Sequence, residues 1–337
     1  MRFALDAAGP HDPETVSPPR TPGSIRRTTS IDSARPDGVH GPVDFDGRAR
    51  DVCTGDDGSI EVLAVDAFRA RVDPGRVIVS IDADGQPPGL QRLAGAAIRG
   101  GFRSLVDASL PDDAARHSLL HLLLDDLPGA ILVTGYAAQR VDDDVLASAI
   151  RASRGAILQQ ADICAGWASD ASILRIFAAS GEVPVPLGPA APELTPRDDP
   201  DAWHVMEPLS AHGMRRRRRL DLGPLDGGSG THAFDAHFRD SHLDPEGVET
   251  ALHEYAVRGR LDAAERRIVA IEAQARVLPW VECPAAVASV ARLVGAPLAG
   301  LRVDVRRDFT GVSTCTHLND TLRSLEDLEA MLDLGAR

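Results

Sequence analysis

Four residues in the last third of the chain belong to types that bind metals or act as nucleophiles: His253, Cys283, Cys315 and His317. Each cysteine stands at the start of a stretch with helical periodicity. A cysteine at a helix N-terminus faces the positive end of the helix dipole, which lowers the pKa of the thiol and favours the thiolate. Thiolates and imidazoles together bind zinc or iron. We therefore expect these residues to form one thiol/imidazole site.

The chemistry of such a site leaves three functions open. In the first, a zinc or iron ion is held by Cys283, Cys315 and His317, with His253 or a water as the fourth ligand, and the protein is a metalloenzyme acting on a small organic molecule. In the second, Cys283 or Cys315 is a metal-free nucleophile and His317 is its base. In the third, the metal only stabilises the fold of a non-enzymatic binding or scaffold module. The sequence does not decide whether the protein is an enzyme.

Composition excludes some classes of function. The net charge of −14 argues against a general binder of nucleic acids or anionic membranes. The run Arg215–Arg219 opposes that balance, and we interpret it either as a solvated stretch beside a loop or as a contact for an acidic or phosphate-bearing partner. No apolar run reaches the ~20 residues of a membrane span, and the first residues lack an apolar signal core. A cytoplasmic location is therefore expected.

Other candidate residues carry weaker signals. Four cysteines in 337 residues do not make a disulfide framework, so Cys53 and Cys164 are interpreted as small buried apolar side chains. The spacing of His232, His237 and His242 fits neither a helix face nor strand alternation. These three histidines are expected to cluster in a loop.

Turn and linker signals divide the chain into four parts. Residues 1–23 are expected to form a disordered arm, residues 24–180 a first α+β half, residues 181–249 a linker and loop region, and residues 250–337 a second α+β half. Alternating apolar residues with Asp-Gly turns predict hairpins from Ser24 to Asp82. In the rest of the chain, helices are predicted over 90–107, 112–127, 143–179, 282–294 and 315–334, strands over 130–134 and 301–308, and a β-rich region over 250–277.

A degenerate repeat links the two halves. The segment Phe68–Asp84 matches Val257–Gln274: each has a strand with Arg-x-Arg, a turn at an Asp, and a strand reading Ile-Val-x-Ile. Such repeats indicate two copies of one β-meander-plus-helices unit in a pseudo-two-fold arrangement. The second copy carries His253 where the first has Ala64. The functional residues are therefore expected in the second copy, with the first copy degenerate.

The second half resembles a bacterial family catalogued as domain of unknown function 2889. The hallmarks that carry the resemblance are His253-Glu254, Cys283-Pro284-Ala285 and Gly311-Val312-Ser313-Thr314-Cys315-Thr316-His317-Leu318. The resemblance covers Ala251 to Leu334, and segments such as Phe238-Arg239-Asp240-Ser241 and Cys164-Ala165-Gly166-Trp167 extend it over most of the chain. It implies no known reaction.

The same region is similar in layout to the NifU-like scaffolds that assemble iron–sulfur clusters. That resemblance places Cys283 at the cysteine that opens a helix after the β-meander, and Cys315 at the late cysteine. It places His253 near the early cysteine loop, where this chain has no cysteine, and Glu-Cys-Pro replaces the usual Gly-Cys-Gly. The likeness therefore implies a metal-capable position rather than cluster assembly itself.

Overall fold

The chain forms one large antiparallel sheet with helices on one of its faces. The computed structural model describes residues 4–5, 9–141 and 154–335. Eight strands follow the order β10-β9-β8-β7-β2-β3-β4-β5, so each half contributes four consecutive strands that form a meander. The two meanders meet where β2 pairs with β7. The predicted α+β class is confirmed.

The bounds of these elements are as follows. The large sheet contains β2 (Ile25–Ala34), β3 (Val43–Thr54), β4 (Ile60–Val72), β5 (Ile78–Ala83), β7 (Met214–Asp226), β8 (Thr231–Leu243), β9 (Glu249–Asp262) and β10 (Arg267–Val277), and β1 (Ala4–Leu5) pairs separately with β6 (Val185–Pro186). The α-helices are α1 (Phe102–Ser109), α2 (Pro111–Ala115), α3 (Leu119–Arg140), α5 (Arg154–Leu158), α6 (Ser172–Ser180), α7 (Leu301–Asp308), α8 (Thr316–Ser324) and α9 (Leu328–Gly335). The 3₁₀ helices are η1 (Leu90–Leu93), η2 (Ala165–Trp167), η3 (Pro200–Ala202), η4 (Cys283–Leu293), η5 (Gly311–Ser313) and η6 (Leu325–Asp327).

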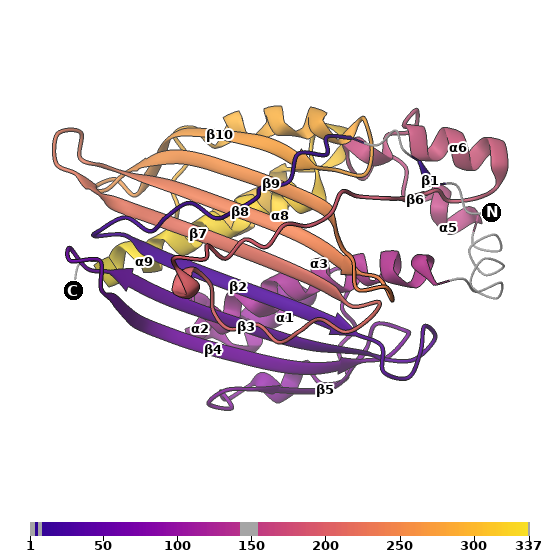
Figure 1. The fold of residues 1–337 in the computed structure, drawn as a ribbon, viewed down its shortest axis with the longest axis horizontal. Helices are drawn as coiled ribbons and strands as arrows, with labels where there is room; N and C mark the ends of the chain where they lie inside the picture. Colours follow the sequence, from indigo (N-terminus) through magenta and orange to yellow (C-terminus); the bar gives the residue numbers. More distant parts are fainter. Residues whose placement is uncertain (1–3, 6–8, 142–153, 336–337) are drawn as a thin grey trace.

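The two faces of the sheet are covered differently. Helices α3, α8 and α9 lie behind the sheet in Figure 1, whereas the N-terminal arm and the segment between β6 and β7 cross its near face. The main apolar core lies between the helices and the sheet, where strand residues such as Phe238, Tyr255 and Val257 pack with Leu318 and Leu322 of α8. Side chains on the helix-facing side of the sheet are therefore enclosed between the sheet and the helices.

The two halves share local hydrogen bonds as well as strand order. Ile78 N donates to Ala96 O, and Ile268 N donates to Ala296 O. Gly95 and Gly295 follow η1 and η4, both with positive φ, and donate to the carbonyls of Ile78 and Ile268 respectively. Only glycine adopts that conformation without steric cost. The matched segments predicted from the sequence are thus the β4–β5 and β9–β10 hairpins.

Several predicted elements are wrong. Residues 181–249 were expected to be linker and loop, but β7 and β8 occupy the middle of the sheet, and Leu225–Gly230 is only the turn between them. The short apolar runs 130–134 and 301–308 were expected to be strands, and both are helical, within α3 and as α7. Periodicity cannot separate a short buried strand from a buried helix, so the packing decided. The helix predicted over 143–179 lies partly outside the described residues.

The N-terminal arm, predicted to be disordered, is packed on the sheet where it is described. Asp12 N donates to Arg276 O, and Ser17 N donates to Leu194 O. Arg20 forms an ion pair of 2.9 Å with Asp199. A proline-rich composition gives no periodic signal of a helix or strand, and disorder was predicted for that reason. The arm is instead held in place by contacts with segments that are distant in the sequence.

The arginine run forms the middle of strand β7. All five side chains of Arg215–Arg219 are buried, so the interpretation as a solvated stretch is wrong. Successive residues of a strand face opposite sides, and here each side supplies carboxylates. Arg215 pairs with Asp32 on one side, while Arg216 and Arg218 reach the helices on the other. A contact with an acidic or phosphate-bearing partner stays a prediction, which this burial does not favour.

A network of buried ion pairs joins the sheet to the helices. All 36 basic residues of the chain are arginines, whose planar guanidinium groups suit bidentate pairing. Arg27 binds Asp51 with Nε and NH2 at 2.8 Å, and Arg216 binds Asp240 with Nε at 2.9 Å and NH2 at 3.0 Å. The remaining members of the network are Arg103, Arg218, Arg302, Arg323, Asp125, Asp126, Asp320 and Asp327. Paired in this way, charges can be buried without leaving an isolated ion.

Gly129 in α3 is expected to be required for this network. A Cβ at this position would overlap the guanidinium of Arg216 and the carboxylate of Asp320. We expect Gly129→Ala to lower the free energy of unfolding by about 1–3 kcal/mol, because the overlap forces buried groups apart. Gly135 is the matched control in the same helix, since a Cβ there would meet nothing within 4 Å. Gly135→Ala should gain about 0.5–1 kcal/mol from helix propensity, and chemical denaturation measures both; equal effects would contradict the argument.

Helix α3 is also the most apolar long segment of the described chain. By length and composition it could span a membrane, but 83% of its most apolar window is buried inside the molecule. A core helix of a soluble protein has the same properties. Here the buried side of α3 packs on β2, β3 and β4.

Candidate functional site

Two of the predicted site residues come together with an aspartate. His253 of β9 and His317 of α8 stack with their ring centroids 3.6 Å apart. Asp240 of β8 lies opposite His253 in the sheet register, with its Oδ2 3.3 Å from His253 Nδ1 and 3.9 Å from His317 Nε2. One ligand atom from each residue lies within 4.8 Å of the other two. We call Asp240, His253 and His317 the His–Asp cluster.

Local structure explains how these side chains meet. The β8–β9 register passes from Asp240↔His253 to Ser241↔Ala251, which leaves Leu252 as an extra residue in β9. Such a bulge bends the strand and changes the direction of neighbouring side chains. His317 lies in the first turn of α8, whose N-terminus packs against β8 and β9. The cluster is thus built by three elements that meet on the helix-covered face of the sheet.

Electrostatics fix the charge of each member. Burial alone raises the pKa of Asp240, but Arg216 and His253 outweigh it, so its pKa lies below the usual range and the carboxylate is ionised. Burial lowers the pKa of His317 well below its usual value, and His253 lowers it further. His317 is therefore a neutral imidazole at pH 7, which is the form that binds metals and accepts protons.

The two ring nitrogens of His317 have different surroundings. Nδ1 lies 3.4 Å from Thr316 Oγ1 and 3.9 Å from Cys315 Sγ. Nε2 is buried and has no hydrogen-bond partner among the described residues. A buried polar atom without a partner costs free energy, so native structures rarely leave one without a role. Both Thr316 Oγ1 and Cys315 Sγ can accept a hydrogen bond from Nδ1, and in that tautomer the lone pair of Nε2 is free.

The cysteines differ from the sequence prediction in their ionisation. Cys283 opens η4 and Cys315 caps α8, so both stand at helix starts as predicted. Burial nevertheless raises the pKa of each thiol, and it raises that of Cys164 to about 11. The predicted lowering by the helix dipole is wrong because desolvation of the thiolate costs more than the dipole supplies. All four cysteines are free thiols.

Cys283 lies outside the His–Asp cluster. Its sulfur packs beside Trp280 and Gly166, and a Cβ on Gly166 would stand 2.5 Å from it. The three buried thiols Cys164, Cys283 and Cys315 all interact electrostatically with the hydroxyl of Tyr255, which follows His253 by two residues on β9. The structure thus brings His253, His317 and Cys315 together, and it places Cys283 and Cys164 in an adjoining apolar layer.

Asp240 was missed because its neighbours in sequence gave no metal-ligand spacing. A comparison of the two halves contains the signal that could have found it: Arg27 and Asp51 pair in the first half as Arg216 and Asp240 do in the second. Strand register then puts Ala64 opposite Asp51, and His253 opposite Asp240. The first half keeps the ion pair but has no histidine at this position.

The three histidines of β8 do not form a cluster, so that prediction is wrong. His232 Nδ1 donates a hydrogen bond to Gly223 O near the turn, and His242 lies buried at the other end of the strand. His237 belongs to a separate group with Glu14 and Glu254, in which its Nε2 lies 3.1 Å from Glu254 Oε1. That group anchors the N-terminal arm, because Glu14 N donates to the same carboxylate at 2.6 Å.

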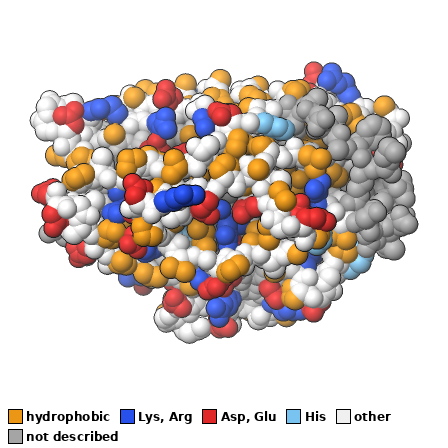
Figure 2. Space-filling model, in the orientation of Figure 1, with side chains coloured by type: hydrophobic (Ala, Val, Ile, Leu, Met, Phe, Trp, Pro, Cys, Tyr) orange, Lys and Arg blue, Asp and Glu red, His pale blue; other side chains and the backbone are white. Residues whose placement is uncertain are grey.

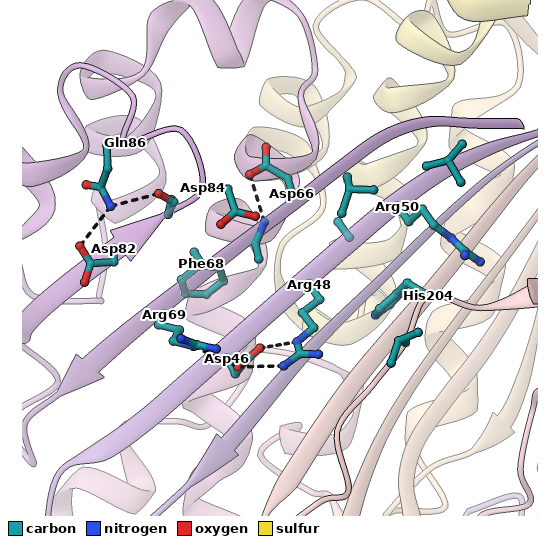
Figure 3. A pocket seen from close by; sticks show the side chains of 16 residues that line it. Asp46, Arg48, Arg50, Asp66, Phe68, Arg69, Asp82, Asp84, Gln86 and His204 are labelled. Carbon is teal, nitrogen blue, oxygen red and sulfur yellow. Dashed lines mark hydrogen bonds and ion pairs between the residues drawn. The ribbon is translucent and has the colours of Figure 1, made fainter.

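A groove lies on the opposite face of the sheet from the His–Asp cluster. It has a volume of about 640 Å³ and lies over β3, β4 and β5 beside Val205 (Figure 3). Its lining is mixed, with Asp66 and Asp84 near Phe68, and the surrounding face shows acidic, basic and apolar side chains interspersed (Figure 2). Burial raises the pKa of Asp66 to about 6.

Comparisons with known proteins agree with this division of the chain. Residues 214–331 match the family model described as "Protein of unknown function (DUF2889)", which supports the predicted family. The match begins at the first residue of β7 and extends into α9, so it spans the half that carries Asp240, His253, Cys315 and His317. No curated protein and no solved structure matches the chain.

Proposed function

We propose that Asp240, His253 and His317 bind a divalent transition metal, zinc or iron. The observation that carries the proposal is the convergence of three donor atoms from β8, β9 and α8, one of which, His317 Nε2, has no partner in the described chain. Two imidazoles and one carboxylate form a donor set that suits both ions.

The donor distances are close to those that an ion requires. In a tetrahedral zinc site with bonds of 2.0–2.1 Å, ligand atoms lie roughly 3.3 Å apart. His253 Nδ1 already lies 3.3 Å from Asp240 Oδ2, and His317 Nε2 lies 3.9 Å from it. Because imidazole lone pairs lie in the ring plane, the stacked rings must also turn apart to share one ion. The required movement is a side-chain rotation and leaves the strands in place.

Neighbouring groups support the ligands. Arg216 holds the carboxylate of Asp240 through two hydrogen bonds, which fixes the direction of its remaining lone pairs. Thr316 Oγ1 and Cys315 Sγ lie beside Nδ1 of His317 and can accept its hydrogen bond, which leaves the lone pair of Nε2 free for the metal. Partners of this kind orient metal ligands in known sites. In this proposal Cys315 orients His317, whereas the sequence alone suggested that it was a ligand.

Three protein ligands leave a fourth position open. A water at that position would be a nucleophile at neutral pH, and a substrate carbonyl there would be polarised. We therefore keep the proposal of a metalloenzyme acting on a small organic molecule as the activity of this site. A cluster-assembly role, suggested by the NifU-like layout, stays a prediction.

Metal analysis of the purified full-length protein tests the proposal. We expect His317→Ala to contain one equivalent of zinc or iron less than the unaltered protein, because the ion loses a ligand that supplies a free lone pair. His232→Ala is the matched control, since His232 is also a histidine of the same half but lies outside the His–Asp cluster, with its ring hydrogen-bonded to the Gly223 carbonyl. Cys315→Ser should keep the metal. Equal metal content in all four proteins would overturn the proposal.

A second candidate is favoured by one specific observation. Cys315 Sγ lies 3.9 Å from His317 Nδ1, and Nε2 of the same ring lies 3.9 Å from Asp240. This is the order nucleophile, base, orienting acid that cysteine hydrolases use, with the looser distances found before a substrate binds. Metal-free protein in which Cys315 alone reacts rapidly with iodoacetamide near neutral pH would favour this candidate. The raised pKa of the thiol argues against it.

The third function left open by the sequence, a metal-stapled binding or scaffold module, has a different consequence. Removal of the ion with a chelator would then unfold the protein or lower its melting temperature strongly. A catalytic ion should be removable with the fold retained, as far-ultraviolet circular dichroism would record. The buried ion-pair network beside the cluster already joins helices to sheet, so we expect retention.

We also propose that the chain arose by duplication of one four-stranded unit. Two correspondences between ion pairs support it: Arg27–Asp51 corresponds to Arg216–Asp240, and across the central strand pair Arg26–Asp221 corresponds to Arg215–Asp32. A pseudo-two-fold axis between β2 and β7 would relate each pair to its counterpart. On this view the metal ligands were gained or kept in only one copy.

A further inference from the structure

A second cavity, apart from the His–Asp cluster and from the groove on the open face, has features of a ligand site. It lies at the end of β8, has a volume of about 270 Å³, and is lined by Arg140, His212, His242, Asp244 and Glu246. His242 is fully buried, and neither of its ring nitrogens has a hydrogen-bond partner in the described chain. The same holds for Nδ1 of His212.

Buried, unpartnered nitrogens on two adjacent imidazoles are costly. Burial of a polar group without a hydrogen bond costs free energy, because the group loses its hydrogen bonds to water. An ordered ion or water is the usual explanation for such atoms in native proteins. The cavity beside His242 provides the space that such an ion needs.

The surrounding structure holds the two imidazoles in place. The rings of Tyr136 and His242 pack edge to face, with their centroids 5.5 Å apart. The hydroxyl of Tyr136 donates a hydrogen bond to Pro186 O. His212 has φ of 58°, a left-handed conformation that is uncommon outside glycine, and its backbone N donates to Leu243 O. Backbone strain of this kind persists where the surrounding structure enforces it, often at ligand sites.

We propose that His212 and His242 bind a divalent transition metal of the zinc class, with carboxylate oxygen from Asp244 or Glu246. The ring centroids lie 6.0 Å apart. Two imidazoles on a tetrahedral ion have centroids about 5 Å apart, so an approach of about 1 Å suffices. The two acidic residues outnumber the one arginine on the lining, which favours a cation. This site is independent of the one proposed above.

Zinc titration of two backgrounds separates the two sites. His317→Ala protein, in which the His–Asp cluster is incomplete, should still bind one equivalent of zinc, and His317→Ala/His242→Phe should bind none at the same concentration. Phenylalanine keeps the contact with Tyr136 and removes the unpartnered nitrogens, so we expect the His242→Phe fold to be at least as stable as the parent. His212→Asn, which tolerates the left-handed backbone, should weaken zinc binding by at least about tenfold.

One outcome of these zinc titrations would overturn the proposal of a second metal site. If His317→Ala and His317→Ala/His242→Phe take up the same amount of zinc in isothermal titration and elemental analysis, the second site does not exist. A result in which only His242→Phe lowers the zinc content, while His317→Ala does not, would support this site and refute the His–Asp cluster. Retained stability of His242→Phe, measured by thermal denaturation, ensures that lost binding is not lost folding.

Discussion

Arg216→Met should destabilise the protein by about 3–5 kcal/mol, more than any other single substitution considered for this chain. Arg216 is buried between β7 and the helices, and it pairs with Asp240 on the sheet and Asp320 on α8. Removal of its charge leaves two carboxylates buried without this cation. Their desolvation is then uncompensated, which is the main source of the loss. Denaturation by urea or guanidinium measures the change.

Two further variants serve as controls for the Arg216→Met substitution. Arg258→Met removes an ion pair with Asp235 from the surface, where Arg258 is 56% exposed, and should cost no more than about 1 kcal/mol. Arg216→Lys keeps the charge but cannot form the two parallel hydrogen bonds to Asp240, so it should restore only part of the loss. An Arg216→Met protein as stable as Arg258→Met would show that the network contributes little.

Acidification from pH 7 to pH 5 should lower the free energy of unfolding, with His204 alone contributing about 2 kcal/mol. Burial, together with neighbouring Arg50 and Arg215, lowers the pKa of His204 to about 3. In the unfolded chain its pKa is about 6.5. Between those values the unfolded state binds one more proton than the folded state, so stability falls by about 1.4 kcal/mol for each pH unit below 6.5 and stops falling near pH 3.

The slope of stability against pH, rather than the stability at any one pH, identifies His204 as the group that causes the loss on acidification. His204 Nε2 lies 2.8 Å from Ser30 Oγ, and Nδ1 lies 2.9 Å from Thr28 Oγ1. His204→Gln should therefore lower stability at pH 7 but flatten its dependence on pH between 6.5 and 4. Ser30→Ala removes one hydrogen bond without removing the titrating group, so its curve should run parallel to that of the unaltered protein. Parallel curves for both variants would contradict this assignment.

The sequence by itself determined much of the local structure and the half in which the site lies. Alternation and Asp-Gly turns predicted the hairpins of the first meander, and the Arg-x-Arg match identified the β4–β5 and β9–β10 hairpins. Helix starts at Cys283 and Cys315 were predicted from periodicity. His253, which has no metal-ligand spacing to His317 in the chain, was found by comparing the two copies. These features depend on near neighbours or on repetition, and both are visible in a linear chain.

Only the tertiary structure decided which residues form the cluster and how they are charged. The five arginines of β7 resemble a solvated run in sequence, but carboxylates from distant strands and helices allow them to be buried. Asp240 joins His253 through strand register, and His317 joins both through the docking of α8. The thiols of Cys283 and Cys315, expected to be ionised, stay protonated because burial outweighs the helix dipole. Desolvation and pairing depend on contacts between distant segments, so no local pattern could have predicted them.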